Sequence, residues 1–273
     1  MVEVLVHFVA PALVGVLIGI ASGLLGIGGG TVMVPIFRLA FGMSATMSTA
    51  TSLFAIIPTS ISGAISHVKG KTCIPALGIA AGLGGACLSP VGVWLAQLSP
   101  DWLVMLAAAL IIGYSAINMF KKAFKLRPAC QPVAGADAAA PTADDSSLSR
   151  KQLLQGAAIG LVAGLASGYV GVGGGFIMVP LMLSIIGIPM RKASGTSLIA
   201  VMILAIPGVI EQGIIGNINY LAGIAIVIGT IPGAVIGARL VTKVPECTLR
   251  LLFGCFLIVA AVMLVLNEVG IFG

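Results

Sequence analysis

The sequence predicts an all-α integral membrane protein built from two homologous repeats, and three observations predict it. Of the 273 residues, 59% are hydrophobic and only 8% are charged, and the mean hydropathy is +1.19; a soluble domain carries about a quarter charged residues. Apolar runs of about 20 residues, the length that crosses a bilayer, recur along the chain. The first half of the chain also aligns with the second half without a gap. We therefore expect a multi-pass protein of the cell (inner) membrane.

The apolar runs predict four to five helical segments in each repeat, because lipid offers the backbone no hydrogen-bond partners. Repeat 1 (1–120) contains Leu5–Ile27, Thr31–Phe41, Met47–Val68, Cys73–Gln97 and Trp102–Phe120, and repeat 2 (153–273) contains Leu153–Val172, Phe176–Ile188, Ala193–Ile215, Tyr220–Val241 and Leu251–Leu266. Residues 121–152 have basic ends around a stretch rich in Ala, Pro, Asp and Ser. This composition predicts a flexible linker, and its basic ends place it on the cytoplasmic side.

The duplication is carried by a glycine motif. SGLLGIGGGTVMVP, which starts at Ser22, aligns with SGYVGVGGGFIMVP, which starts at Ser167, at an offset of 145 (167 − 22). Farther on, the tripeptide T-S-L at Thr51 aligns with T-S-L at Thr196. Shared apolar composition alone does not produce a common GxGGG with a proline five residues later. The two halves are therefore repeats, and duplicated halves are a common plan of transporters.

The basic residues favour an inverted relation between the repeats. Lys69 and Lys71 follow the third segment of repeat 1, whereas Arg191 and Lys192 precede the matching segment of repeat 2. If basic loops are cytoplasmic, corresponding loops lie on opposite sides of the membrane. Arg38 does not fit this pattern, so a parallel arrangement of the repeats stays open.

Each motif contains three consecutive glycines, which we expect to break the first helix of each repeat into a helical hairpin. Glycine weakens a helix by about 1 kcal/mol relative to alanine and permits positive φ. The half-helices that follow would point free N–H groups toward the break, where an anion could bind. Paired broken segments indicate a transport site. The alternative is that these glycines only allow close helix packing, as the regularly spaced glycines elsewhere in the chain do.

Two kinds of polar side chain complete the candidate site. The duplicated Thr and Ser hydroxyls suit weak anion binding, although they could equally bond to the helix backbone. Ionisable residues in or near apolar runs are candidates for a charge or proton role, simple solvation near the interface being the alternative. The candidate substrate-binding residues are Gly28, Gly29, Gly30, Thr31, Thr51, Ser52, Gly173, Gly174, Gly175, Phe176, Thr196 and Ser197, and the ionisable candidates are Arg38, His67 and Glu211.

Several function classes are not favoured. The net charge of +6 comes from basic residues that stand singly or in small groups between apolar runs, which is typical of topology signals and not of nucleic-acid binding. The sequence contains no Ser/His/Asp set, no paired carboxylates and no His/Cys cluster. We therefore predict no enzyme activity, no metal and no cofactor.

The two copies of SGxxGxGGGxxxVP, the T-S-L segments and the closing GARL at Gly237–Leu240 resemble the TauE/SafE family of sulfite-exporter-like permeases. The resemblance covers nearly the whole chain outside the linker. It implies an inner-membrane transporter of small anions, such as sulfite, sulfoacetate and related organosulfur anions. It also marks the motif glycines, Pro35, Pro180 and the Thr-Ser pairs as functional.

We therefore expect a secondary transporter that moves a small anion by alternating access at the repeat interface. A proton or a sodium ion is the candidate coupling ion, and the oligomeric state is open. Two alternatives are kept: a membrane anchor or regulatory subunit of a redox or sensor complex, and a carrier of a non-anionic solute.

Overall fold

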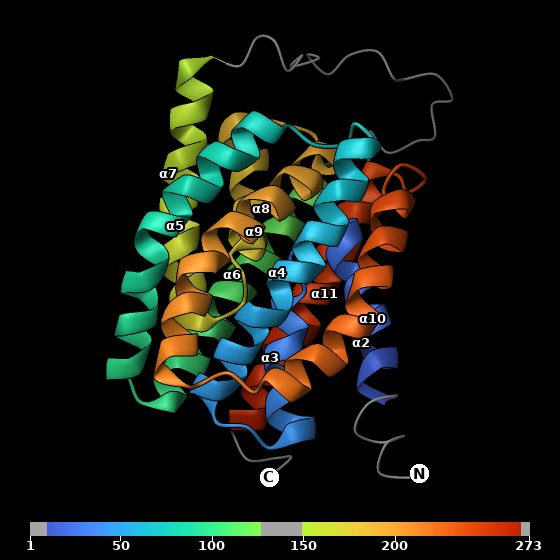
Figure 1. Cartoon of the computed structure of the whole chain (residues 1–273). Coiled ribbons are helices and arrows are strands. Elements are labelled where there is room, and N and C mark those ends of the chain that lie inside the picture. The colour runs from blue at the N-terminus through green and yellow to red at the C-terminus, as the bar shows by residue number, and fades with distance from the viewer. Residues whose placement is uncertain (1–9, 127–148, 269–273) are drawn as a thin grey trace.

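The computed structural model describes residues 10–126 and 149–268, and the regular structure of these residues is entirely helical (Figure 1). The first half contains α2 (Ala10–Leu25), α3 (Gly30–Phe41), α4 (Ala45–Lys69), α5 (Pro75–Leu98) and α6 (Asp101–Leu126). The second half contains α7 (Arg150–Val170), α8 (Gly175–Leu181), the π-helix η3 (Met182–Ile186), α9 (Met190–Ile215), α10 (Tyr220–Leu240) and α11 (Glu246–Glu268). Seven of the described helices, α4 to α7 and α9 to α11, are long and apolar enough to cross a membrane. The prediction of an all-α membrane protein is confirmed.

Both glycine motifs end one helix and start another, as predicted. Helix α2 ends at Leu25 and α7 at Val170, so each stops two residues earlier than the predicted apolar segment. The next helix begins only after several residues with positive φ, a conformation in which only glycine avoids steric strain. These residues are Gly26 (φ 75°), Gly28 (81°) and Gly29 (86°) in the first motif, and Gly171 (70°), Gly173 (85°) and Gly174 (59°) in the second. We call these two segments, 26–29 and 171–174, the first and second glycine breaks.

The ends of the predicted linker are helical. Helix α6 continues to Leu126, and α7 begins at Arg150. Ser149 caps α7, because its side chain accepts a hydrogen bond from Lys151 N while Gln152 Oε1 accepts one from Ser149 N. This reciprocal capping defines a helix start. The rest of the predicted linker, residues 127–148, lies outside the described residues.

Helices from different halves pack together through their regularly spaced glycines. A methyl group on Gly19 would meet the Cα atom of Thr230 at 2.8 Å, and one on Gly160 would meet the Cα atom of Ala81 at 2.9 Å. Helix α2 thus lies against α10, and α7 lies against α5, each pair running in the same direction. Small residues allow this close approach of two helix backbones in lipid. The halves are interlocked, since each first helix packs on a helix of the other half.

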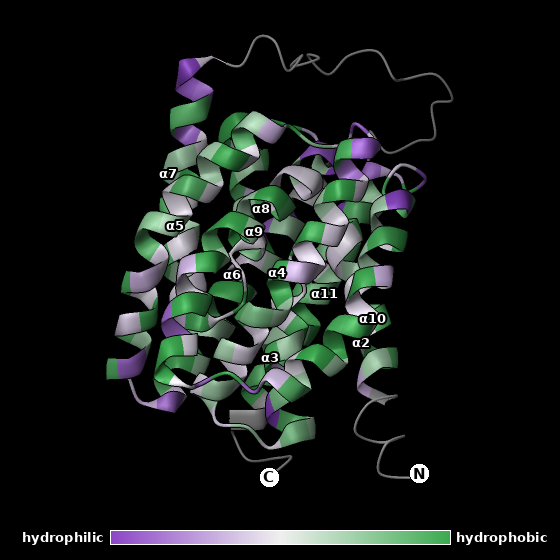
Figure 2. Cartoon of the chain, in the orientation of Figure 1, coloured by the Kyte–Doolittle hydropathy of each residue, from purple (hydrophilic) through white to green (hydrophobic). Residues whose placement is uncertain are grey.

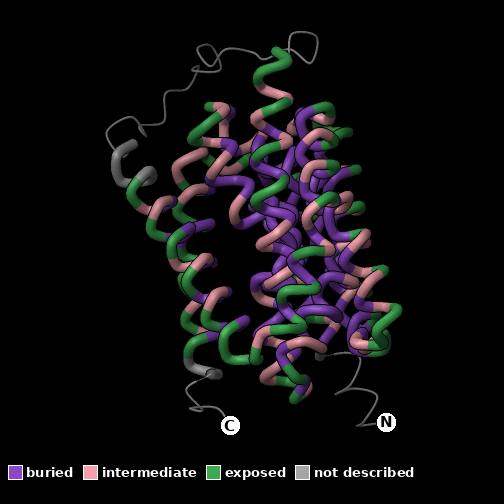
Figure 3. The backbone as a smooth tube through the Cα atoms, turned by 90° about the vertical axis from the view of Figure 1, so that its left-hand side faces the viewer, coloured by how far each residue is buried: buried purple, intermediate pink, exposed green. Residues whose placement is uncertain are grey.

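The connections of the chain lie at two opposite faces of the bundle. In Figure 1 the start of α2 and the end of α11 lie at the bottom, whereas the end of α6 and the start of α7 lie at the top. Hydrophilic residues gather at these two faces, and the middle of the bundle is hydrophobic (Figure 2). The buried residues follow the middle of the bundle and the exposed ones its outside (Figure 3). Such a distribution fits a protein that spans the membrane.

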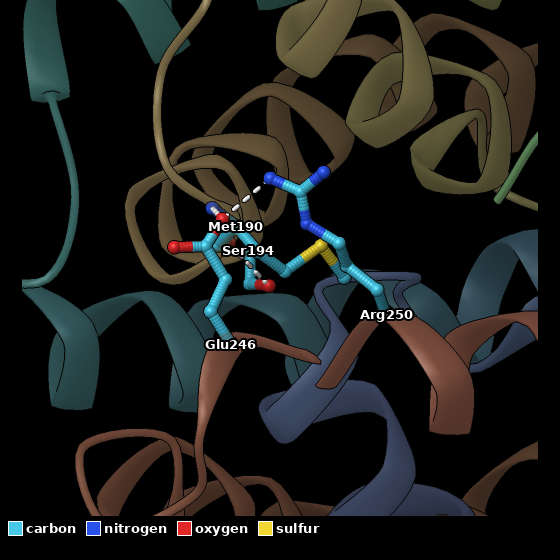
Figure 4. Close-up of polar contacts among 4 residues, drawn as sticks. All are labelled: Met190, Ser194, Glu246 and Arg250. Carbon is cyan, nitrogen blue, oxygen red and sulfur yellow. Dashed lines mark hydrogen bonds and ion pairs between the residues drawn. The ribbon is translucent and has the colours of Figure 1, made fainter. Parts of the chain in front are cut away.

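An acidic residue fixes the start of α4 and of α9 at equivalent positions. Ala45 N donates to Asp101 Oδ2 at 3.2 Å, and Met190 N donates to Glu246 Oε1 at 3.1 Å. Each pair is related to the other by the offset of 145 residues. In the second half Arg250 also pairs with Glu246, and the Ser194 hydroxyl donates to Met190 O (Figure 4). A carboxylate at a helix N-terminus is stabilised by the free N–H groups and the helix dipole. These contacts hold α4 and α9, which carry the residues that face the breaks.

Candidate functional site

The two glycine breaks touch each other inside the bundle. A methyl group on Gly30 would lie 2.5 Å from Val172 O, and one on Gly175 would lie 2.5 Å from Gly26 O and 2.9 Å from the Cα atom of Ile27. Ile27 and Val172 have no exposed surface. The backbones of the two breaks are thus in direct contact, which only glycine permits at positions 30 and 175. The sequence predicted that the breaks meet, and in this conformation the space between them is closed.

Each break also packs on a long helix of the opposite half. The Ser197 hydroxyl of α9 donates to Gly26 O at 2.7 Å, and a methyl group on Gly26 would meet the Ser194 Cα atom at 2.5 Å. In the same way, a methyl group on Gly171 would meet the Thr49 Cα atom of α4 at 2.6 Å. Thr49 and Ser194 are equivalent in the two repeats. Ser197 therefore orients the first break, and its buried hydroxyl already has its hydrogen-bond partners.

The helices that follow the breaks begin without a side-chain cap. Gly29 and Gly174 stand at the N-cap positions of α3 and α8, where they have no hydroxyl or carboxylate to accept from the first turn. Within α3, Val32 and Met33 donate to Gly29 O, whereas the N–H groups of Gly30 and Thr31, the first two of the helix, have no acceptor within it. Such N–H groups and the dipole of the helix favour a negative charge. Phe176, the counterpart of Thr31, is fully buried.

Ile56 of α4 and Val201 of α9 fill the space beside the breaks. Ile56 Cδ1 lies 2.5 Å and 2.7 Å from the positions of methyl groups on Gly30 and Gly173, and Val201 Cγ1 lies 2.9 Å from that on Gly28. Both side chains are fully buried. They are equivalent residues of the two repeats (201 − 56 = 145). Apolar side chains therefore occupy the position predicted for a small anion.

Thr51 and Thr196, two of the candidate residues, hold the starts of helices of the opposite half. Asn219 N donates to Thr51 Oγ1 at 3.0 Å, just before α10, and Ile74 N donates to Thr196 Oγ1 at 2.9 Å, just before α5. Both threonines are fully buried. These two hydroxyls therefore bond to the backbone, which is the alternative to anion binding that the sequence left open. Each of the two hydrogen bonds joins one half of the chain to the other.

Other hydroxyl groups near the breaks are buried without a hydrogen-bond partner. Ser52, a candidate from the sequence, is one of them. Ser22 and Ser167, the first residues of the two motifs, and Ser60 of α4 are others that the sequence interpretation missed. The only signal for Ser22 and Ser167 was their duplication, whereas Ser60 has Ala205 as its counterpart and gave no signal.

The ionisable candidates lie away from the breaks. His67 is fully buried near the end of α4, where Nε2 bonds to Gly23 O at 2.8 Å and Nδ1 to Thr72 Oγ1 at 2.7 Å. The equivalent Gln212 accepts from Asn217 Nδ2 at 2.8 Å. Both pairs connect a helix end to the turn that follows it. Glu211 is half-buried in the last turns of α9, and Arg38 lies in the last turn of α3.

A cavity of about 740 Å³ lies beside the second hairpin, between α6, α7 and α8. Its lining is mostly apolar but includes Ser115, Asn118 and Tyr169. The Tyr169 hydroxyl donates to Ser99 Oγ at 3.0 Å. The cavity reaches Ile177 and Pro180 of α8 and so opens toward the helix that starts at the second break.

Comparison with known proteins gives a family and a set of relatives. The family model for sulfite exporter TauE/SafE matches residues 11–264. The chain is 27% identical to the probable membrane transporter protein YunE of Bacillus subtilis, with 97% of this chain and 99% of that protein covered. It is 28% identical to the probable membrane transporter protein YdhB of the same species (87% and 92% covered) and 29% identical to a probable membrane transporter protein of Haemophilus influenzae (93% and 97%). No solved structure matches the chain.

Proposed function

Because the chain belongs to the TauE/SafE family, we propose that it is a secondary membrane transporter of a small anion, with sulfite and sulfur-containing organic anions as the substrate class. The observation that carries the proposal is the pair of uncapped helix starts, those of α3 and α8, at two glycine breaks that meet inside a membrane-spanning bundle. The names of the relatives, which are all probable membrane transporters, support transport in general.

The chemistry of the breaks supports an anion over a cation. N–H groups and hydroxyl donors face the breaks, and both stabilise negative charge. They do so without a buried permanent cation, which would bind the anion too tightly for release. Hydroxyl and amide donors give the moderate affinity that a carrier needs on both sides of the membrane.

The arrangement of the halves supports alternating access. The equivalent helices α2 and α7 begin at opposite faces of the bundle: α2 begins at the face where α11 ends, and α7 begins at the face where α6 ends (Figure 1). These directions support inverted repeats, with the face where α6 ends and α7 begins in the cytoplasm. The breaks are closed on each other in this conformation, so rocking of one half against the other opens the site to one side at a time.

The test is anion flux into proteoliposomes for two double variants. Gly29→Leu with Gly174→Leu places two large side chains at the breaks, at residues with φ of 86° and 59°. Gly42→Leu with Gly187→Leu is the matched control, because these glycines also have positive φ (61° and 77°) but have nothing within 4 Å of an added methyl group. Both variants carry a similar backbone strain of about 1–2 kcal/mol per residue, and only the first blocks the breaks.

We expect the wild type and the control to transport sulfite or sulfoacetate under an imposed proton or sodium gradient, and the break variant to be inactive. Gel filtration in detergent verifies that both variants are folded. Unimpaired flux in the break variant would refute the proposed site, and absence of flux of every anion in the wild type would refute anion transport.

A further inference from the structure

The first glycine break is surrounded by buried hydroxyl groups that lack a partner. Ser22, Thr31, Ser52 and Ser60 have no exposed surface, and their hydroxyl oxygens have no hydrogen-bond partner among the described residues. Burying a hydroxyl without a partner is costly, and proteins rarely retain such groups unless a ligand or water satisfies them. A group of four around one feature of the backbone therefore points to a missing ligand.

Two of these side chains, those of Ser22 and Ser60, lie beside the break. Ser60 Oγ lies 3.4 Å from the position of a methyl group on Gly28, and Ser22 Cβ lies 3.6 Å from that on Gly29. Thr31 follows Gly30 in the uncapped first turn of α3. Ser52 and Ser60 stand one helical turn before and after Ile56, so they share its face of α4.

The second break does not have the same set. The counterpart of Thr31 is Phe176, and the counterpart of Ser60 is Ala205. Ser197, the counterpart of Ser52, has its hydroxyl bonded to Gly26 O. Ser167, the counterpart of Ser22, is also buried without a partner, so the second break keeps one of the four unpartnered hydroxyls and the first break has the full set.

We infer that the anion binds asymmetrically at the first glycine break, where the hydroxyls of Ser22 and Ser60 donate to it together with the N–H groups of α3, and that the Ile56 side chain occupies this site when it is empty. This inference rests on the proposed anion transport. It names the substrate class as a small oxyanion, because its several oxygen atoms can each accept from a different donor, the hydroxyls and the backbone N–H groups.

The Ile56 side chain limits the size of the anion that can bind at the first glycine break. Its side chain contacts Gly28, Gly30 and the second break at Gly173. An oxyanion of the XO₃ kind has as many heavy atoms as the isoleucine side chain, so it can take the same space once the side chain turns away. A larger organic anion needs more room than this displacement provides.

The first measurement is the stabilisation of the purified full chain by sulfite in a thermal-shift titration, for the wild type, Ser60→Ala and Ser66→Ala. Ser60→Ala removes an unpartnered hydroxyl and installs the residue that the second repeat has, so we expect the melting temperature without anion to stay equal or rise. We expect the dissociation constant for sulfite to rise about tenfold, the loss of one hydrogen bond to a charged group. Ser66→Ala is the control, since Ser66 lies on the same helix as Ser60, its half-buried hydroxyl bonds only within α4, and its backbone borders Gly70 and not the break; the affinity of this variant should equal that of the wild type.

The second measurement compares sulfite with the larger sulfoacetate in Ile56→Ala and in the equivalent Val201→Ala. Ile56→Ala should improve the affinity for sulfoacetate relative to sulfite by about tenfold, whereas Val201→Ala should change this ratio less. If Ser60→Ala binds sulfite as the wild type does, or if Ile56→Ala leaves the ratio unchanged, the inference is wrong while anion transport stands. If no anion stabilises or crosses with the wild type, the proposed function itself fails.

Discussion

The contact between the two glycine breaks can be tested by adding one methyl group at Gly175. An added Cβ atom there would lie 2.5 Å from Gly26 O, whereas ordinary contact begins at 3.4 Å, so the two breaks must separate by up to 0.9 Å (3.4 − 2.5). The obstacle is backbone that Ser197 holds through its hydrogen bond to Gly26 O, so it cannot rotate away as a flexible side chain would.

The expected cost follows from this geometry. Overpacking of a well-packed interior costs about 1–3 kcal/mol, and the backbone obstacle places Gly175→Ala in the upper part of this range. The gain in helix propensity from glycine to alanine, about 1 kcal/mol, offsets part of it. We expect a net loss of about 1–2 kcal/mol, which corresponds to a fall in Tm of roughly 2–8 °C, together with slower transport.

The assay is thermal unfolding in detergent with flux measured on the same preparation. Gly113→Ala is the control, because Gly113 lies within α6 and an added methyl group has nothing within 4 Å. It should leave Tm unchanged or raise it, with normal flux. A Gly175→Ala variant that matches Gly113→Ala in both stability and flux would show that the two breaks do not touch in the working protein.

Three further predictions concern the Thr196–Ile74 hydrogen bond, the side chain of His67 and the membrane topology. Thr196→Val removes the acceptor of Ile74 N and leaves a buried N–H group without a partner. We expect a loss of stability of about 1–3 kcal/mol, seen as a lower Tm, while the folded fraction transports normally. An unchanged Tm would contradict a stabilising role of this hydrogen bond between the halves. His67→Gln installs the side chain of the equivalent Gln212, so we expect flux with the same pH profile as the wild type, and a lost pH dependence would assign His67 a role in proton transfer instead. Reporter fusions in the 69–71 and 214–218 loops should report opposite sides of the membrane, and a common side would refute the inverted repeats.

Part of the candidate site could be predicted because it depends on local chemistry. Three consecutive glycines interrupt a helix wherever they stand, so the breaks at Gly28 and Gly173 follow from the residues themselves. The uncapped starts of the next helices follow as well, since no residue with a capping side chain stands at the N-cap position. The contact between the two glycine breaks was a hypothesis taken from the duplication, and the backbone distances at Gly30 and Gly175 confirm it.

The roles of the hydroxyl groups could not be predicted in the same way. Thr51 and Ser52 are neighbours in one duplicated tripeptide, yet Thr51 accepts a hydrogen bond from Asn219 N while Ser52 has no partner. The partner of Thr51 lies 168 residues away. Nothing within the tripeptide indicates which hydroxyl meets the other half, because that depends on the rotation of α4 against its neighbours. The repeat counterpart of Ser60 is Ala205, so the duplication did not draw attention to the Ser60 hydroxyl.

The sequence alone determined that this chain lies in a membrane, that it is a duplication, and where its first helices break, because hydrophobicity and backbone freedom are properties of each residue and its neighbours in the chain. Only the tertiary structure decided that each first helix packs on the other half, that the breaks close on one another, and that Ile56 and Val201 fill the space beside them. These contacts join residues far apart in the chain, and they depend on helix direction and rotation, which no local pattern encodes.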